Sequence, residues 1–563
     1  MNQPRNLSTL STTEFDTLII GGGISGAWLA LHSAQQGYKT ALIEKRDYAS
    51  QTSSSSSKLL HSGLRYLQQL QFGRSRESAM ERAEYIYAAP HLSMPVRFIV
   101  PTYKALQKSK FFLGCGMLLY RLLCIGENNI IGSIEHRLQN FKFISAKRLN
   151  QLCDLSNEKH TGGVVFSEQH MHDSERMVLA ILQTARQSGA VVHNYVSAQD
   201  FVMSGDQVIG AKAKDELSGI TMEIRSKLVI NAAGPWIDSL NSKLKDAEQA
   251  PSINGFAVGS HVISKRQICD HAIAITTKQQ TDAKIDRGGR HMFIIPWRGH
   301  SLIGTSYDDS DAPEDDIKIQ SEHVDQLIDG INQGMPSAKL TRNDLVSGYS
   351  GLYDLQTDKF KSSVYQGSAE YQVIDHSKTN GVGGLITALG AKFTTGRKLS
   401  ALTMKIIGDK LDKPFKLTRV KLHSSMYESL NEFTQTKIKQ YEDQFSATTI
   451  RHLIVQYGSQ IDQFIERIAP YDKLRETIFA QQEDLFGQVV WAIEQEQAVT
   501  LNDVVFNRTS LGLLGIDEES VHKIAALMAE HLNWSQETQQ QQLTQVLTRL
   551  RETQAALKGG QNQ

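Results

Sequence analysis

Three glycines near the amino terminus, Gly21, Gly23 and Gly26, occupy the positions of a G-x-G-x-x-G sequence. In dinucleotide-binding folds the first glycine permits a tight turn, the second lets the backbone approach a pyrophosphate, and the third lets a helix pack closely on a strand. The amino terminus of that helix then presents free N–H groups and a favourable dipole to the anion. This spacing therefore predicts the binding of a dinucleotide.

The segments around these glycines have the lengths and patterns of a βαβ unit. Residues 15–20 (FDTLII) form a short apolar run, residues 27–37 (AWLALHSAQQG) have helical spacing, and residues 38–45 (YKTALIEK) are again strand-like. Glu44 ends the second strand, where a carboxylate can accept hydrogen bonds from a ribose. A carboxylate there disfavours NADP, whose 2′-phosphate it would repel, but it does not distinguish NAD from FAD.

A serine-rich segment, residues 51–59 (QTSSSSSKL), begins seven residues beyond Glu44. Serine runs are usually flexible linkers. This one begins where a chain leaving the second strand would return over the cofactor, and its hydroxyl groups and Lys58 are suited to a pyrophosphate. Its position favours a cofactor cradle over a spacer.

The composition narrows the classes of partner. The chain has 563 residues, 40% of them hydrophobic, which predicts two to four domains. Lys and Arg together number 60, as do Asp and Glu, so we expect no nucleic-acid partner. The four cysteines are too sparse for a disulfide framework and suit a reducing, cytoplasmic compartment. Cysteines and histidines show no zinc-type spacing, so we expect no metal.

One apolar segment raises the question of membrane contact. Residues 111–126 (FFLGCGMLLYRLLCIG) are shorter than the roughly 20 apolar residues of a spanning helix, and Lys104, Lys108 and Lys110 precede them. Two interpretations remain: a helix lying in the membrane interface, or a buried core helix. We therefore expect a cytoplasmic protein, with peripheral contact at the inner face of the membrane as an alternative.

Several segments in the same order resemble the FAD-dependent glycerol-3-phosphate dehydrogenases and oxidases of the DAO-like flavoprotein superfamily. The resemblance includes the Gly-rich and serine-rich segments and extends into the helical carboxy-terminal part. It implies FAD as cofactor and an α/β (α+β) fold: a Rossmann-like FAD-binding domain, an inserted antiparallel-sheet substrate domain and a carboxy-terminal all-helical cap. The other segments that carry it are residues 89–98 (APHLSMPVRF), 230–238 (INAAGPWID), 259–263 (GSHVI), 293–306 (FIIPWRGHSLIGTS), 349–355 (YSGLYDL) and 390–400 (GAKFTTGRKLS).

Domain boundaries and FAD contacts follow from the same resemblance. We expect residues 14–90, 160–250 and 365–412 to form the FAD-binding domain, 91–159 and 251–364 the substrate domain, and 418–563 the helical domain, frayed after Trp534. Residues 1–13 are expected to be a flexible tail. The expected FAD contacts are Gly21, Gly23, Ile24, Ser25, Gly26, Glu44, Lys45, Thr52, Ser53, Ser57, Lys58, Leu59, Val196, Ala232, Gly234, Trp236, Gly390, Lys392, Phe393 and Thr394.

The implied reaction is the oxidation of a secondary alcohol, in which a base takes the hydroxyl proton while hydride passes to the flavin. His261 is the expected base, because imidazole titrates near neutral pH, although an isolated histidine is more often structural. Lys392 matches a lysine near flavin and substrate, where a cation can bind phosphate or stabilise negative charge. Arg65, Tyr66 and Tyr353 match positions around the substrate. Electrons would then pass to a membrane quinone if residues 111–126 are exposed, or to oxygen or a soluble acceptor if they are buried.

The sequence departs from the family where the substrate phosphate is expected. The family's usual Y-S-G-V-R-P-L is YSGLYDL here, with Tyr353 and Asp354 in place of arginine and proline. Losing one bidentate arginine costs on the order of 2 to 5 kcal/mol in binding a desolvated anion, and a nearby carboxylate adds repulsion. Further departures are Ser62, Val258, Ala391 and Gly396.

These departures leave alternatives for the function. The first is oxidation of glycerol 3-phosphate to dihydroxyacetone phosphate. The second is oxidation of a different, non-phosphorylated alcohol or amine in specialised biosynthesis, since Tyr353 replaces the arginine. A minor alternative is a non-catalytic FAD-binding protein, and the sequence does not determine the oligomeric state.

Overall fold

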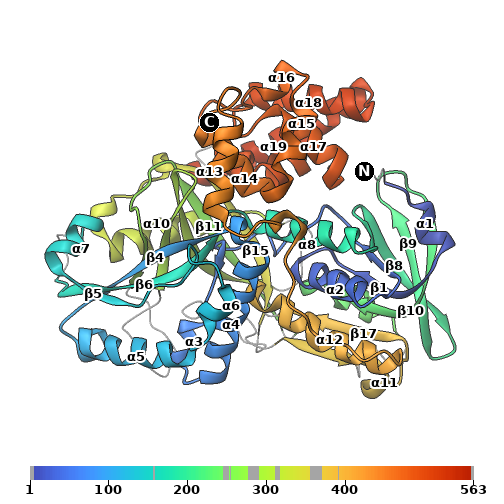
Figure 1. Cartoon of the computed structure of the whole chain (residues 1–563), viewed down its shortest axis with the longest axis horizontal. Coiled ribbons are helices and arrows are strands. Elements are labelled where there is room, and N and C mark those ends of the chain that lie inside the picture. The colour runs from blue at the N-terminus through green and yellow to red at the C-terminus, as the bar shows by residue number, and fades with distance from the viewer. Residues whose placement is uncertain are drawn as a thin grey trace.

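The chain folds into two β-sheets that lie side by side, with a layer of helices across one end of both (Figure 1). This computed structural model describes residues 5–155, 159–244, 253, 255–276, 291–310, 317–355, 371–390 and 392–559, without the side chains of Arg65 and Gln68. The architecture confirms the predicted fold class of a Rossmann-like sheet, a largely antiparallel second sheet and a helical carboxy-terminal region.

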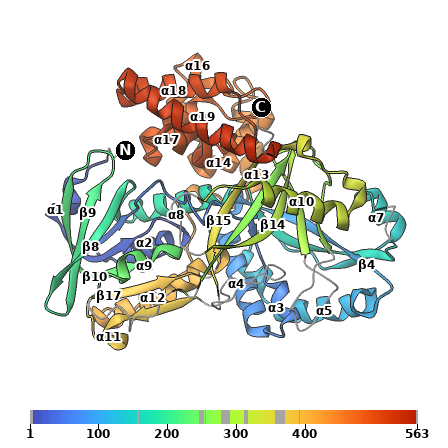
Figure 2. The ribbon, with the colours of Figure 1, turned by 180° about the vertical axis from the view of Figure 1, so that it is seen from behind.

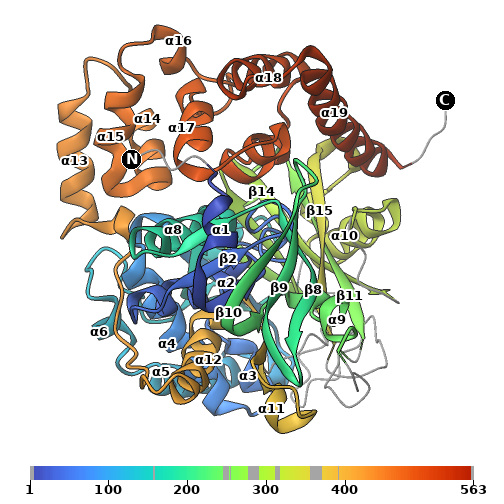
Figure 3. The same ribbon diagram turned by 90° about the vertical axis from the view of Figure 1, so that its right-hand side faces the viewer.

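The first sheet has a parallel centre in the order β17, β10, β1, β2 and β7, with β16 antiparallel at one edge. The strands β1, β2, β10 and β17 each contain a short, buried apolar run, because both faces of the sheet are covered there. A hairpin of β8 and β9 extends antiparallel from β10, as Figure 3 shows. The strands are β1 (Glu14–Ile20), β2 (Thr40–Ile43), β7 (Val191–His193), β8 (Val196–Ser204), β9 (Gln207–Asp215), β10 (Thr221–Asn231), β16 (Gln372–Asp375) and β17 (Leu385–Leu389).

Helices cover one face of this sheet, and the hairpin with short helices covers the other. Ile19 points into the cluster formed with the first group, whereas its neighbours Leu18 and Ile20 point into the second, as expected for alternating side chains in a strand. The helices are α2 (Ile24–Gln35), α8 (Ser174–Gln187) and α12 (Gly396–Lys410) on the first face, and α1 (Ser8–Thr12) and α9 (Asp238–Asn241) on the second; α11 (His376–Thr379) follows β16.

The expectation of a flexible tail over residues 1–13 is wrong for its described part. Leu10 on α1 is fully buried under the first sheet, and Arg5 donates a hydrogen bond to Asp215 at 2.5 Å. A buried leucine and a partly buried ion pair are sufficient to order this short segment.

The second sheet runs in the order β15, β11, β14, β13, β12, β4, β6 and β3, and β5 also pairs with β6. All of these pairs are antiparallel except β4 with β12. β3 and β6 lie in this sheet, although the predicted boundaries assigned their residues to the FAD-binding domain. The strands are β3 (Leu59–Leu60), β4 (Ser93–Thr102), β5 (Lys142–Ser145), β6 (Gly162–Met171), β11 (Phe256–Ser264), β12 (Ala272–Thr276), β13 (His291–Trp297), β14 (His300–Ser310) and β15 (Leu345–Asp354).

One face of the second sheet packs on α10 (Ser321–Gly334) and α7 (Ala146–Leu152), seen from behind in Figure 2. Cys153 and Cys269, 116 residues apart, are disulfide-bonded beside this core, a pairing that the sparse cysteines did not lead us to expect. At the end of the molecule opposite the helical layer lie α3 (Leu64–Gln68) and α5 (Lys110–Leu123), and α4 (Phe72–Ala88) and α6 (Glu127–Ile131) lie between them and the second sheet in Figure 1.

The helical layer extends from α13 to α19. Its last helix does not fray after Trp534, because Leu543, Val546 and Leu557 are buried, and α19 ends against β15 and α10. No helix in the described part of the chain combines the length and apolarity needed to cross a bilayer. The helices are α13 (Leu430–Gln440), α14 (Ala447–Tyr457), α15 (Ile461–Ile468), α16 (Asp472–Arg475), α17 (Phe486–Glu496), a π-helical turn (Asp503–Arg508), α18 (Glu518–Leu532) and α19 (Gln536–Lys558).

Candidate active site

The turn between β1 and α2 has no space for side chains. A Cβ atom on Gly21 would lie 2.6 Å from the carbonyl oxygen of Ala232, and one on Gly26 would lie 1.9 Å from the carbonyl oxygen of Gly21. Gly21 also has φ +112°, which disfavours other residues. These contacts bring the amino terminus of α2 against the ends of β1 and β10, which is the geometry that a pyrophosphate site requires.

The carboxylate of Glu44 is fixed beside this turn. It accepts hydrogen bonds from the backbone N–H groups of Gly22 at 2.6 Å and Arg46 at 2.9 Å. Burial raises the pKa of Glu44, and the two N–H groups partly offset this effect by favouring the charged form. Val196 is fully buried, and its N–H group binds the carbonyl of Glu44 at 2.8 Å, whereas Lys45 is exposed. Glu44 is therefore held at the end of β2, where a dinucleotide ribose is expected.

The serine-rich segment packs against both sheets. The hydroxyl of Ser53 accepts a hydrogen bond from the N–H of Ile24 at 3.0 Å, and a Cβ on Gly23 would lie 3.0 Å from the same oxygen. At the other side, Thr52 donates to the carbonyl of Leu352 at 2.7 Å. These contacts place the Ser53 hydroxyl at the amino terminus of α2.

Lys58 differs from our expectation of a pyrophosphate contact. Its side chain is fully buried and donates to both carboxylate oxygens of Glu175, at 3.0 and 2.8 Å, and it lies 3.7 Å from Asp173. The charge of Lys58 is therefore matched by carboxylates at the start of α8. Of its neighbours, Ser57 lies 3.4 Å from His61, and Leu59 is buried in β3.

Segments that follow β10 and β17 complete the surroundings of the turn. A Cβ on Gly390 would lie 2.7 Å from the hydroxyl of Ser25, and the carbonyl of Phe393 accepts a hydrogen bond from Tyr85 at 3.0 Å. Thr394 is buried in the same short turn. Gly234 and Trp236 lie in the turn after β10, and the buried Nε1 atom of Trp236 has no hydrogen-bond partner among the described residues.

His261 lies in the second sheet, on β11. Its ring stacks on Tyr349 of β15 with centroids 5.2 Å apart, and its Nε2 atom lies 3.2 Å from the hydroxyl of Thr305. Its buried Nδ1 atom has no hydrogen-bond partner within the described residues. Burial lowers the pKa of His261 to about 3, with smaller effects from Lys58 and His61, so the imidazole is neutral at physiological pH. Its pKa lies below the near-neutral value on which our choice of His261 as the base rests.

The two residues that replace the family's Arg-Pro lie on opposite faces of β15. Tyr353 lies on the His261 face, because a Cβ on Gly259 would be 3.5 Å from its ring, and it packs edge-on against Tyr307. Asp354 pairs with Phe256, whose side chain belongs to an apolar cluster on the other face. Burial raises the pKa of Asp354 to about 7. Our expectation that the replacement brings a carboxylate near the substrate phosphate is therefore wrong.

Lys392 and Tyr66 form a second group. The ammonium nitrogen of Lys392 lies 4.5 Å from the centroid of the Tyr66 ring and donates to the hydroxyl of Ser78 on α4 at 2.5 Å. The side chain of Arg65, also expected here, lies outside the described residues.

Sequence reasoning missed Thr305, Ser78 and Tyr349. Of these three residues, only Tyr349 could have been placed at the site from the sequence, because it lies four residues before Tyr353 and therefore shares its strand face.

These residues fit FAD. The side-chain-free glycine turn puts the amino terminus of α2 beside the Ser53 hydroxyl, as a pyrophosphate site requires, and Glu44 provides a carboxylate at the ribose position. The second sheet adds a buried, neutral histidine with an unpartnered nitrogen among the described residues. A Rossmann-like sheet with this turn, joined to a second sheet that carries a buried histidine, is the arrangement of a dinucleotide-dependent oxidoreductase.

Comparison with known proteins gives the same result. Residues 16–402 match the FAD dependent oxidoreductase family, and residues 417–539 match the C-terminal domain of alpha-glycerophosphate oxidase. The chain is 30% identical to a glycerol-3-phosphate dehydrogenase of Synechocystis sp., over 95% of this chain and 96% of that one. The chain therefore belongs to the FAD-dependent oxidoreductase family and, within it, to the glycerol-3-phosphate dehydrogenases, as the sequence motifs predict.

A further relative and one solved structure support this assignment, and a second solved structure shares the fold. The mitochondrial glycerol-3-phosphate dehydrogenase of Homo sapiens is 29% identical over 95% of this chain and 73% of its own length. The crystal structure of the glycerol-3-phosphate dehydrogenase from Bacillus halodurans, complexed with FAD, superposes with a TM-score of 0.77 at 25% identity and covers 97% of both chains. The FAD-bound L-alpha-glycerophosphate oxidase from Mycoplasma pneumoniae, at 15% identity and a TM-score of 0.52, shares the fold over 72% of this chain.

Proposed function

We propose that this protein oxidises glycerol 3-phosphate to dihydroxyacetone phosphate and passes the electrons to a membrane quinone. The observation that carries the proposal is His261, a buried imidazole whose Nδ1 atom lacks a hydrogen-bond partner among the described residues, on the same strand face as Tyr353. The names of the relatives that match nearly the whole chain support this substrate over a non-phosphorylated alcohol or amine.

The chemistry divides between the cofactor and the protein. When bound, FAD supplies the two-electron acceptor that takes hydride from the substrate carbon and passes the electrons on. His261 takes the hydroxyl proton, so that the C–O bond becomes a carbonyl. The stacked ring of Tyr349 orients the imidazole, and the burial of His261 keeps bulk water from its ring nitrogens.

The substrate phosphate requires a cation, because the arginine of the family is missing. Lys392 beside Tyr66 is our candidate among the described residues. Asp354 lies on the opposite face of β15 and does not repel the phosphate. Tyr353 contributes a phenol at the position of the missing guanidinium.

Anaerobic mixing tests this substrate. We expect glycerol 3-phosphate to bleach the oxidised flavin absorbance, with one molecule of dihydroxyacetone phosphate formed per flavin, whereas glycerol, which lacks the phosphate, does so only at far higher concentration. Lys392→Met should weaken glycerol 3-phosphate binding more than it slows the reaction with glycerol. If dithionite reduces the bound flavin but glycerol 3-phosphate does not, this substrate is excluded.

The proposed quinone acceptor depends on the surface of α5. The apolar residues on its outer side follow helical spacing and are 40 to 77% exposed, while Leu113, Met117 and Tyr120 on the other side are buried. Lys104, Lys108 and Lys110 precede this surface, which is suited to an anionic bilayer interface. The outer residues, called the α5 surface below, are Phe111, Leu118, Leu119 and Leu122, continued by Ile125.

Vesicle binding tests the α5 surface. Leu118 and Leu122 are 57 and 55% exposed, so inserting each into lipid gains about 1 kcal/mol, and the double variant Leu118→Asp/Leu122→Asp should bind at least about tenfold more weakly. The rate at which this double variant reduces ubiquinone in vesicles should fall by the same factor as its vesicle binding. Its turnover with a soluble artificial acceptor should be unchanged.

The matched control is Leu217→Asp/Ile220→Asp, which changes two exposed apolar residues between β9 and β10. We expect it to bind vesicles like the wild type. If the α5 variant also binds like the wild type, the α5 surface is not the membrane contact, and oxygen consumption by the wild type would identify oxygen as the acceptor.

A further inference from the structure

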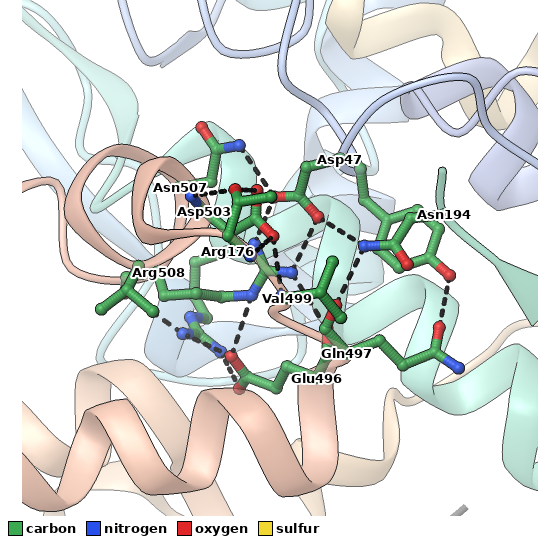
Figure 4. Close-up of polar contacts among 12 residues, drawn as sticks. Asp47, Arg176, Asn194, Glu496, Gln497, Val499, Asp503, Asn507 and Arg508 are labelled. Atoms are coloured by element: carbon green, nitrogen blue, oxygen red, sulfur yellow. Dashed lines mark hydrogen bonds and ion pairs between the residues drawn. The ribbon is translucent and has the colours of Figure 1, made fainter. Parts of the chain in front are cut away.

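A buried polar cluster joins the helical layer to the loop after β2 (Figure 4). The carboxylate of Asp47, 2% exposed, accepts hydrogen bonds from Arg508 at 2.6 and 2.9 Å and from Asn507 at 2.8 Å, both in the π-helical turn. A further bond comes from Asn194, at 3.0 Å. Most of the partners of Asp47 therefore belong to a segment more than 450 residues later in the chain.

The guanidinium of Arg508 is itself held in place. It donates to the carbonyl of Glu496 at 2.9 Å, and its Nε atom lies 3.4 Å from the Glu496 carboxylate. The same carboxylate pairs with Arg176 of α8. All of these side chains are at most 4% exposed, so the helical layer presents Arg508 to Asp47 in a fixed orientation.

The loop that Asp47 anchors is packed against the glycine turn. The N–H of Ala49 donates to the carbonyl of Gly22 at 3.1 Å, and a Cβ on Gly22 would lie 2.9 Å from atoms of both Glu44 and Tyr48. Tyr48 also reaches the helical layer, where its hydroxyl donates to Gln497 at 2.6 Å. Gly22 is thus enclosed by two residues of this loop.

The backbone of the loop of residues 44–49 includes a conformation that its surroundings must stabilise. Ala49 has φ +55°, a left-handed conformation that residues with a side chain rarely adopt unless their surroundings impose it. The surroundings of residues 44–49 include Arg508 and Gln497, both contributed by the helical layer.

We propose that Arg508 is a positioning residue for FAD: by holding Asp47 it fixes the loop of residues 44–49, and so keeps Glu44 and Gly22 in place for the adenosine half of the cofactor. This inference rests on FAD binding at the glycine turn and does not depend on which substrate is oxidised. Because coupling between two equilibria is reciprocal, FAD in turn strengthens the docking of the helical layer.

Release of FAD from the full-length holoenzyme tests the proposal without any turnover. After dilution, the rise of free-flavin fluorescence gives the rate and extent of FAD loss. We expect Arg508→Met to weaken FAD binding about tenfold or more, within the usual range of coupling between sites, and Arg508→Lys to restore part of the loss. Asp47→Asn should weaken binding similarly, and the double variant Asp47→Asn/Arg508→Met should be no weaker than the worse single variant.

Arg467→Met is the matched control. Arg467 pairs with Glu494 through two hydrogen bonds at 2.8 and 2.5 Å within the helical layer, and in the described part of the chain neither residue bonds to the loop of residues 44–49. This variant should lower the thermal stability of the layer and leave FAD affinity unchanged. If it weakens FAD binding as much as Arg508→Met, or if Arg508→Met binds FAD within twofold of wild type, the positioning role is wrong.

Two further measurements keep the test decisive. If Arg508→Met does not fold, Gln497→Met removes only the acceptor of Tyr48 and should still speed FAD loss severalfold; unchanged loss would refute the proposal.

Hydrogen exchange in the turn Asp503–Arg508 should slow when FAD binds to the apoprotein, and this protection should be smaller in Asp47→Asn. Equal protection in both proteins would contradict the coupling.

Discussion

Replacing Lys58 by methionine tests whether this residue stabilises the fold or binds the pyrophosphate of the cofactor. The structure places its ammonium in a fully buried pair with Glu175, at 2.8 and 3.0 Å, with Asp173 at 3.7 Å. Removing one partner of a buried pair leaves an uncompensated charge and costs about 3 to 5 kcal/mol. Because two carboxylates share this lysine, we expect a loss of about 4 to 5 kcal/mol from the free energy of unfolding.

Urea denaturation followed by tryptophan fluorescence measures this loss. Trp297 is a suitable probe, since Lys58 lies 5.4 Å from the centroid of its ring. The double variant Lys58→Met/Glu175→Gln removes the stranded charge and should recover most of the stability. Lys214→Met, which breaks an exposed pair with Glu216, is the control and should change the midpoint little.

The pH dependence provides a second check on the same variant. Burial already raises the pKa of Glu175, and Lys58 counteracts that effect, so its removal raises the pKa further. A group whose pKa is higher in the folded than in the unfolded state costs stability as pH rises through the folded pKa. The deficit of Lys58→Met should therefore be smaller at pH 5 than at pH 8. A variant that keeps wild-type stability at both pH values but loses FAD would refute this reasoning and return Lys58 to the pyrophosphate.

Three other predictions concern the glycine turn and the second sheet. Gly26→Ala should purify without FAD, because its Cβ would lie 1.9 Å from the Gly21 carbonyl, whereas Gly73→Ala, whose Cβ meets nothing within 4 Å, should retain FAD; equal flavin content in the two would contradict the packing. Asp354→Asn should be more stable than wild type at pH 8, by up to about 4 kcal/mol, and nearly equal to it at pH 4. Burial raises the pKa of Asp354 to about 7, so charging this carboxyl costs stability as pH rises. Thermal unfolding at both pH values measures the difference. The rate of flavin reduction by glycerol 3-phosphate should show no loss between pH 8 and pH 5 that is due to His261, whose pKa is lowered to about 3, and an inflection near pH 6.5 that disappears in His261→Asn would contradict this.

The local part of the cofactor site could be predicted from the sequence. Gly21, Gly23 and Gly26 encode close approaches between neighbouring segments, and Glu44 follows at the end of the next strand of the same βαβ unit. Short-range spacing determines such a unit, because the strand, turn and helix pack on one another whatever the rest of the chain does.

The partners of charged residues could not be predicted in this way. Lys58 pairs with a residue 117 positions later, and Asp47 with one 461 positions later. Periodicity indicates which side of a strand or helix a residue occupies but not what packs against that side. The same limit led us to place Asp354 near the substrate phosphate. Alternation along the strand puts Asp354 on the face opposite Tyr353, but what packs against each face became clear only from the register with β11.

The sequence by itself determined the class of this protein: the dinucleotide turn, the family motifs and the presence of a helical carboxy-terminal region. Only the tertiary structure decided that the outer side of α5 is exposed, that Lys58 is neutralised by Glu175, and that the helical layer holds the loop next to the cofactor through Arg508. The physical reason is that exposure and charge pairing are properties of segments brought together from distant parts of the chain, whereas turns and helices depend on neighbours in sequence.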